Sequence, residues 1–137
     1  MNSKLSLNQI RNDLKYLNKF EVIVYGSYAS DNFTQRSDID IAIITRKNDE
    51  KQNIEVWKKA LRKVKPIYQM NVFELLPLNV KANVIDEFIV VFGDRLEISE
   101  YFYYFRKLWK DIKYRFFSNQ FTHFREKIKK LQLILKN

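Results

Sequence analysis

Apolar residues recur along the chain with two different periods, which predict helices in some segments and strands in others. Helical spacing of apolar residues predicts helices over 5–18, 49–64 and 78–87. Short runs rich in β-branched and aromatic residues predict strands over 20–25, 38–45, 67–75 and 88–92. Because strands and helices are interleaved, we expect an α/β (α+β) fold with a small mixed β-sheet and flanking helices.

The last third of the chain has a different character, because aromatic and basic residues crowd it. Residues 96–116 predict a helix, and another helix is expected to follow Ser118-Asn119 and run to the end. Its apolar residues are spaced 4, 3, 4, 3, 4 and form a narrow heptad-like seam: Phe117, Phe121, Phe124, Ile128, Leu131 and Leu135. We therefore divide the chain into a domain over 1–95 and a basic, aromatic-rich C-terminal helical extension over 96–137. Three roles are open for the seam. It can dock on its own domain, self-associate into a homo-oligomer or bind a helical partner.

The composition is that of a folded chain of one domain. The 137 residues are 46% hydrophobic and 15% aromatic, which suffices for one core. Absence of cysteine excludes disulfides, thiolate chemistry and cysteine zinc sites. The N-terminal residues lack the apolar core of a signal peptide, and no apolar run approaches the roughly 20 residues of a membrane span. We expect a cytoplasmic protein with no membrane contact.

The net charge of +9 is unevenly distributed. Residues 101–137 carry ten Lys or Arg and two acids, so nearly all of the excess lies there. One interpretation is a solvated helical face. The other is an electrostatic surface for a polyanion or an acidic partner, which includes nucleic-acid binding through the C-terminal basic helices.

Two carboxylates in the second predicted strand are the first candidates for chemistry. Asp38 and Asp40 alternate with isoleucines, so the carboxylates share one face while the isoleucines anchor the strand in the core. They lie about 6 to 7 Å apart along the backbone, a spacing at which both reach one divalent ion, Mg²⁺ or Mn²⁺, bound together with substrate phosphates. Gly26-Ser27 lies upstream at the exit of a strand, with one helical turn expected after it, where backbone amides and a hydroxyl can hold phosphate oxygens.

The segment VIVYGSYASDNFTQRSDIDIAII (22–44) resembles the signature of the DNA polymerase β-like nucleotidyltransferase superfamily. The short length, with LLPLNVKANVIDEFIVVFGD (75–94), is similar to its minimal nucleotidyltransferase (MNT) branch. The resemblance implies a nucleotidyltransferase fold over the first domain. It also implies Mg²⁺-dependent transfer of a nucleoside monophosphate from a nucleoside triphosphate to a protein or small acceptor. Gly26, Ser27 and Ser37 would hold the nucleotide, and Asp38 and Asp40 would be the catalytic metal ligands.

The sequence departs from the family pattern at the third carboxylate, which the family places on the next strand as acid/base and metal ligand. By position that group should fall near Gln69, and Asn71 is expected on the same face; neither side chain is a carboxylate. Glu74 is expected to alternate to the opposite face. An amide cannot accept a proton, so we expect nucleotide or Mg²⁺ binding to survive better than catalysis. Asp31 or a partner chain is the remaining candidate for the missing group.

The resemblance also implies a protein partner. MNT proteins are often paired with a small all-helical HEPN protein, as the antitoxin half of a toxin–antitoxin system, and some transfer a nucleotide to that partner. The alternative function is therefore a catalytically weakened antitoxin or binding module that pairs with a HEPN-like protein. The C-terminal basic, aromatic helices are then the expected contact surface.

Overall fold

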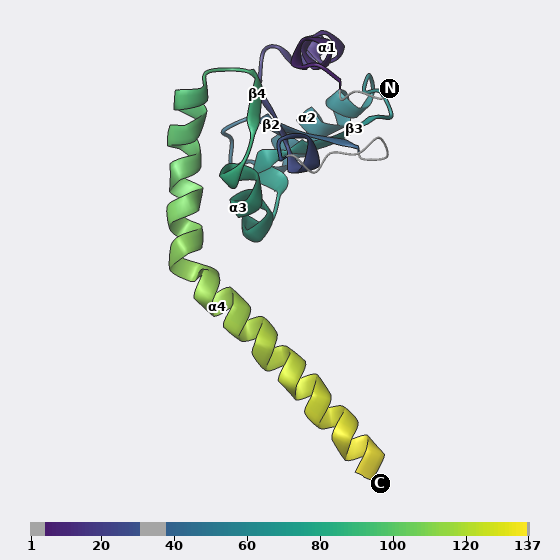
Figure 1. The fold of residues 1–137 in the computed structure, drawn as a ribbon, viewed down its shortest axis with the longest axis vertical. Helices are drawn as coiled ribbons and strands as arrows, with labels where there is room; N and C mark the ends of the chain where they lie inside the picture. The colour runs from purple at the N-terminus through teal and green to yellow at the C-terminus, as the bar shows by residue number, and fades with distance from the viewer. Residues whose placement is uncertain (1–4, 31–37, 137) are drawn as a thin grey trace.

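The computed structural model describes residues 5–30 and 38–136, and these form a mixed four-stranded sheet with helices on both faces (Figure 1). The elements are α1 (Leu7–Asp13), η1 (Lys15–Leu17), β1 (Glu21–Tyr25), η2 (Gly26–Tyr28), β2 (Ile39–Ile44), α2 (Glu50–Leu61), β3 (Tyr68–Val72), η3 (Phe73–Leu75), α3 (Leu78–Asp86), β4 (Ile89–Phe92) and α4 (Arg95–Lys136). The strand order is β3-β2-β1-β4; β1 pairs antiparallel with β2 and β4, and β2 pairs parallel with β3. The expected fold class is confirmed.

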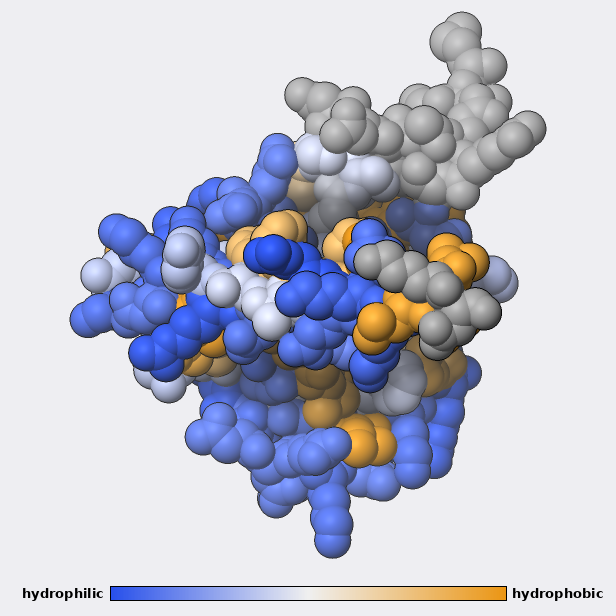
Figure 2. All heavy atoms as spheres, turned by 90° about the horizontal axis from the view of Figure 1, so that it is seen from below, coloured by the Kyte–Doolittle hydropathy of each residue, from blue (hydrophilic) through white to orange (hydrophobic). Residues whose placement is uncertain are grey.

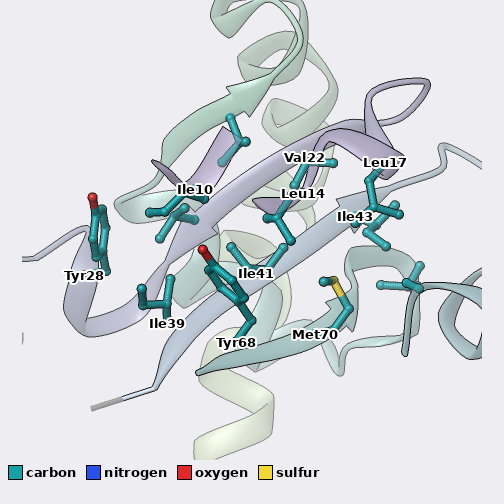
Figure 3. Packing of buried hydrophobic residues seen from close by; sticks show 14 residues of the cluster. Ile10, Leu14, Leu17, Val22, Tyr28, Ile39, Ile41, Ile43, Tyr68 and Met70 are labelled. Atoms are coloured by element: carbon teal, nitrogen blue, oxygen red, sulfur yellow. The ribbon is translucent and has the colours of Figure 1, made fainter. Parts of the chain in front are cut away.

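One face of the sheet is covered by α1, η1 and α2. Alternate residues of β1, β2 and β3 pack there against α1 and η1, and Figure 3 shows these side chains pointing toward one another. The fully buried members include Ile10, Leu14, Ile39, Ile41 and Ile43. The predicted isoleucine face of β2 is therefore confirmed.

The other face of the sheet packs against α3 and the start of α4. Ile23, Ala42 and Ile44 contribute from the sheet, while Ile98 and Phe102 contribute from α4. Because both faces are covered, Ile41 to Ile44 are all buried. A strand held in this way is a rigid support for Asp40 at its start.

Two predicted elements end earlier in the structure than in the sequence pattern. The predicted helix over 5–18 is α1 followed by the separate 3₁₀ turn η1. The predicted strand over 67–75 stops at Val72, and Phe73 begins the 3₁₀ turn η3. The period of apolar residues does not predict where α1 and β3 end, because the apolar pattern continues through both 3₁₀ turns.

The C-terminal region is a single 42-residue helix, so the predicted break at Ser118-Asn119 is wrong. The sequence has no glycine or proline between Arg95 and Lys136, and serine or asparagine alone weakens a helix only slightly. The Thr122 hydroxyl donates to the Ser118 carbonyl at 2.9 Å, inside the continuous helix. Figure 1 shows α4 bending part-way and extending far from the body of the molecule. The division of the chain at residue 95 stays a prediction.

None of the helices in the described ranges is long and apolar enough to span a membrane.

Glu74 fastens the start of α4 to the far end of β2. One carboxylate oxygen accepts hydrogen bonds from the Thr45 amide at 3.0 Å and the Thr45 hydroxyl at 3.1 Å. The other accepts from the Arg46 amide at 2.9 Å and the Tyr101 hydroxyl at 2.8 Å. Arg46, at φ +60, in turn places its guanidinium on Glu21 at 2.6 and 2.9 Å. Glu74 is thus a structural carboxylate.

We expect Glu74→Ala to lower the free energy of unfolding by about 3 kcal/mol, because the Thr45 amide, the Arg46 amide and the Tyr101 hydroxyl lose an ionised acceptor. Glu74→Gln should cost about half as much, since its amide retains only one acceptor oxygen. Urea unfolding measures both changes. The exposed Glu87→Ala serves as the control and should change the free energy by less than about 0.5 kcal/mol. A loss below about 1 kcal/mol for Glu74→Ala would contradict this role.

Candidate functional site

The loop after β1 turns at Gly26, whose φ of +70 is in the left-handed region that favours glycine. The Gly26 carbonyl accepts from the Ala29 amide at 3.1 Å and the Ser30 amide at 3.0 Å, so the chain closes one helical turn. The helical turn expected after Gly26 is therefore confirmed as η2. Tyr28 is buried at its end and donates its hydroxyl to the Leu5 carbonyl, which anchors this turn to the N-terminal segment.

Asp40 lies directly against Gly26. A Cβ atom added to Gly26 would meet Oδ2 of Asp40 at 2.3 Å, far inside van der Waals contact. Register explains the approach, because Tyr25 pairs with Asp40 across the antiparallel β1–β2 ladder and Gly26 follows immediately. The glycine is required twice: for its backbone conformation and for the space that the carboxylate occupies.

Asp38 and Asp40 are adjacent carboxylates in different surroundings, exposed and half-buried respectively. Burial, and then the negative charge of Asp38, raise the pKa of Asp40 above its ordinary value. The charged form of Asp40 is therefore disfavoured by folding, and its contribution to stability is lost as pH rises through its raised pKa. A cation bound to the Asp40 carboxylate, or an amide in place of that carboxylate, would remove the cost of burying the charge.

The position expected for a third carboxylate is occupied by Gln69. The parallel β2–β3 ladder pairs Asp40 with Gln69 and Ala42 with Asn71, which confirms the predicted position of the amide. Glu74 lies in η3 and binds Thr45 and Arg46 at the other end of β2. The predicted alternation of Glu74 to a strand face is wrong, because β3 ends at Val72. Its carboxylate is nevertheless not available to Asp38 and Asp40, since it is held by Thr45 and Arg46. Within the described ranges no group of three or more Asp, Glu, His or Cys side chains could hold a metal ion.

Tyr25 is a site residue that the sequence pattern did not single out. It pairs with Asp40, and its hydroxyl accepts from the Asn71 amide at 2.8 Å. Burial raises the pKa of Tyr25, and the charge of Asp40 raises it further against the opposing hydrogen bond from Asn71. The signal was available, since an antiparallel hairpin that brings Gly26 to Asp40 also brings the preceding residue there.

The remaining predicted nucleotide ligands are placed only in part. Ser27 lies in η2 beside Gly26 and is partly exposed. Ser37 and Asp31 lie outside the described residues, so their predicted roles stay predictions. The donor set of Asp38 and Asp40 is all oxygen and carries two negative charges, which fits one Mg²⁺ or Mn²⁺ completed by phosphate oxygens and water. Gln69, which pairs with Asp40 on the neighbouring strand, offers an amide oxygen as a further protein ligand.

Comparison with known proteins assigns the chain to a family. The family described as nucleotidyltransferase domain matches residues 7–134, and the chain belongs to it. A relative named "Putative protein adenylyltransferase MJ1547", from Methanocaldococcus jannaschii, is 43% identical over 109 residues, which cover 80% of this chain and 84% of the relative.

Solved structures share the fold at low sequence identity. A chain of a toxin–antitoxin crystal structure with AMP-PNP is 18% identical with a TM-score of 0.58, covering 85% of this chain and 99% of its own. A chain from a structure described as a tri-AMPylated Shewanella oneidensis HEPN toxin in complex with MNT antitoxin is 14% identical with a TM-score of 0.53, covering 84% and 99%. The expected nucleotidyltransferase fold is thereby confirmed.

Proposed function

We propose that this chain is a Mg²⁺-dependent protein adenylyltransferase, which moves AMP from ATP to a hydroxyl group on a protein. The observation that carries the proposal is the approach of the Asp40 carboxylate to Gly26 at the joined ends of β1 and β2. It brings together the pair of carboxylates that would bind metal and the turn that would bind phosphate. Family membership and the name of the 43% identical relative support both the reaction class and a protein acceptor.

Each group of the candidate site would have a role in this reaction. An acceptor oxygen forms a bond to the α-phosphorus, the bond from that phosphorus to the β-phosphate oxygen breaks, and pyrophosphate leaves. Asp38 and Asp40 would hold Mg²⁺, which offsets charge on the phosphates. Gly26 and Ser27 would orient the triphosphate. The acceptor proton passes to solvent or phosphate, since the Gln69 amide cannot take it.

The natural acceptor class to test is a HEPN-type helical protein, because the structural neighbours include chains from complexes of HEPN toxin and MNT antitoxin. The acceptor experiment incubates the purified chain with Mg²⁺, a co-expressed HEPN-type protein and ATP labelled at either the α- or the γ-phosphate. Label transfer from the α-position alone, with release of pyrophosphate, is expected. Transfer from the γ-position would indicate phosphoryl transfer and contradict the proposal.

A second candidate is an antitoxin-like module that binds nucleotide and partner without turnover, and Gln69 opposite Asp40 is the observation that favours it. It predicts Mn²⁺-dependent ATP binding and co-purification with the helical partner, without release of pyrophosphate. Calorimetric titration of ATP, with and without Mn²⁺, tests the binding that both candidates require, and the assay for pyrophosphate separates them. Absence of both ATP binding and partner co-purification would reject the two together.

Gly26→Ala is expected to impair both stability and metal-nucleotide binding. The left-handed backbone costs an alanine about 1–2 kcal/mol, and the added Cβ displaces the Asp40 carboxylate it would meet at 2.3 Å. We expect Mn²⁺·ATP affinity to fall at least about 10-fold, corresponding to about 1.4 kcal/mol, as measured by calorimetry.

Gly93→Ala is the matched control, because Gly93 also has a positive φ, of +121, but its added Cβ would contact Ile98 and Glu21. It should lose stability and keep its affinity for Mn²⁺·ATP. Equal losses of affinity in the two variants would show that backbone strain, and not the position of Asp40, is responsible.

A further inference from the structure

The outer part of α4, from Phe117 to Leu135, presents an apolar helix face that is exposed to solvent in the part of the chain that the structure describes. Every residue from Phe117 to Leu135 is exposed, and the three seam phenylalanines are each 58–62% exposed. The predicted alternative in which this seam docks on its own domain is therefore wrong. Figure 2, which views the molecule from the free end of α4, shows orange apolar side chains among blue hydrophilic ones. Exposed apolar side chains that recur at heptad spacing along one helix face indicate an interaction surface.

The two halves of the seam differ chemically, and each half faces the other when two copies of the helix run antiparallel. Its first half is aromatic, with Phe117, Phe121 and Phe124, and its second half is aliphatic, with Ile128, Leu131 and Leu135. A parallel pair of these helices would set phenylalanine on phenylalanine in three successive layers. An antiparallel pair sets each ring against an aliphatic side chain, which alternates large and small partners through the core.

The facing layers of that antiparallel pair follow from the heptad spacing. Phe117 faces Leu135 of the second copy, Phe121 faces its Leu131, and Phe124 faces its Ile128. Each contact occurs twice, as an interface with two-fold symmetry requires.

The same register fits the length of helix that is free. It sets Lys136 of one copy opposite Phe116 of the other, and Phe116 is the last partly buried residue of α4. The pairing thus covers the exposed stretch from end to end and stops at Phe116, whose ring packs on Trp109 of the same helix. Figure 1 shows that this stretch stands clear of the sheet, so the two bodies would lie at opposite ends of the pair.

From this self-complementarity we propose that a second copy of this chain covers the seam, and that two α4 helices form an antiparallel coiled coil. Charge opposes the pairing but does not decide it. Residues 113–136 carry seven Lys or Arg and one acid, and the register brings Arg125 near Arg125 of the other copy and Lys127 near Lys127 of the other copy. These are solvent-exposed charges that salt screens, whereas each layer removes large apolar side chains from water.

The first test is the mass of the full chain in solution. Analytical ultracentrifugation at about 1–100 μM should show a particle of twice the chain mass of 16.7 kDa. Dimerisation should strengthen when salt is raised from about 50 to about 500 mM, since screening weakens the repulsion between like charges. A monomer at every concentration would overturn the proposal. Association that weakens with salt would indicate contacts between opposite charges and would also overturn it.

The second test reads the register directly. Phe121→Lys and Leu131→Glu should each weaken the dimer by at least about 100-fold, because each places a charge in a buried layer. Mixing the two variants should restore a heterodimer. In one layer the introduced lysine of one chain would face the introduced glutamate of the other. In the symmetry-related layer, Leu131 of the first chain and Phe121 of the second would keep the wild-type contact. A parallel pair would bring neither substituted side chain opposite the other, and mixing would then rescue nothing.

Leu133 provides the matched controls, because it lies on the side of α4 away from the seam and is equally exposed. Leu133→Lys and Leu133→Glu should leave the dimer within about 3-fold of wild type. Circular dichroism of every variant checks that α4 remains helical. Loss of the dimer in the Leu133 variants, failure of the mixed variants to pair, or a seam that associates only with a different protein would each reject the antiparallel self-pair.

Discussion

Asp40→Asn is expected to lower kcat/KM for adenylyl transfer by at least about 10³-fold, equivalent to about 4 kcal/mol of lost transition-state stabilisation. Asparagine has nearly the same shape, so the space beside Gly26 stays filled. What is lost is the negative charge that would hold Mg²⁺ on the triphosphate, a contribution of several kcal/mol. Asp38→Asn should act in the same direction but less strongly, because Asp38 is exposed and less constrained.

The same variant should not destabilise the fold. Since burial and Asp38 raise the pKa of Asp40, ionising this group at neutral pH weakens the folded state, and an amide removes that cost. We expect Tm of the metal-free Asp40→Asn chain to be unchanged or higher by up to about 4 °C. This difference from wild type should shrink as pH is lowered, because Asp40 itself becomes protonated.

Initial rates of pyrophosphate release under single-turnover conditions measure the loss, together with thermal unfolding on the same samples. Asp86→Asn is the control, because Asp86 is an exposed aspartate at the end of α3 and should leave both readings unchanged. If Asp40→Asn retained more than about a tenth of the activity, or the activity fell along with Tm, the assignment of Asp40 as a metal ligand would be wrong.

The sheet could be read from the sequence because its strands obey local rules. The isoleucines of β2 alternate with Asp38, Asp40 and Ala42, and that alternation alone sets which side chains point to the same face of the sheet. Positions beyond the strand ends could not be read in this way. Alternation along the predicted strand places Glu74 on a strand face, whereas it lies in a 3₁₀ turn and is held by long-range partners such as Tyr101.

The site was predictable to the extent that it depends on register. Gly26 and Asp40 meet because two adjacent strands pair antiparallel, and Gln69 joins them because β3 pairs parallel. The contact between Asn71 and Tyr25 depends on how far each side chain reaches across the face, which spacing in the sequence does not specify.

The exposed surface of α4 shows where sequence reasoning stops. The spacing of its apolar residues correctly indicates a helix face, but it carries no information about what covers that face. The structure removes one of the three alternatives, because Phe117 and the rest of the seam are exposed and not docked on the described part of the same chain. The choice between a second copy and a different partner then depends on chemical complementarity.

Gln69→Asp is expected to raise the rate of adenylyl transfer about 10²-fold, or to create measurable transfer if the wild-type chain only binds nucleotide. Gln69 pairs with Asp40 on the neighbouring strand, so an aspartate there would place a third carboxylate in the same row. A positioned general base typically contributes about 10²–10⁴-fold. Aspartate has a shorter side chain than glutamine and reaches less far, which places the expected gain at the lower end.

The added carboxylate should also leave two signatures that a general structural effect would not produce. The rate should rise with pH through the pKa of the new base, and metal-free stability should fall because three carboxylates then repel one another. Gln69→Asn is the matched control, since it has the shape of aspartate without the charge, and it should produce neither change. If Gln69→Asp binds Mn²⁺·ATP more tightly but transfers no faster, this strand position would supply a metal ligand and not the base, and the acceptor proton would have to leave by another route.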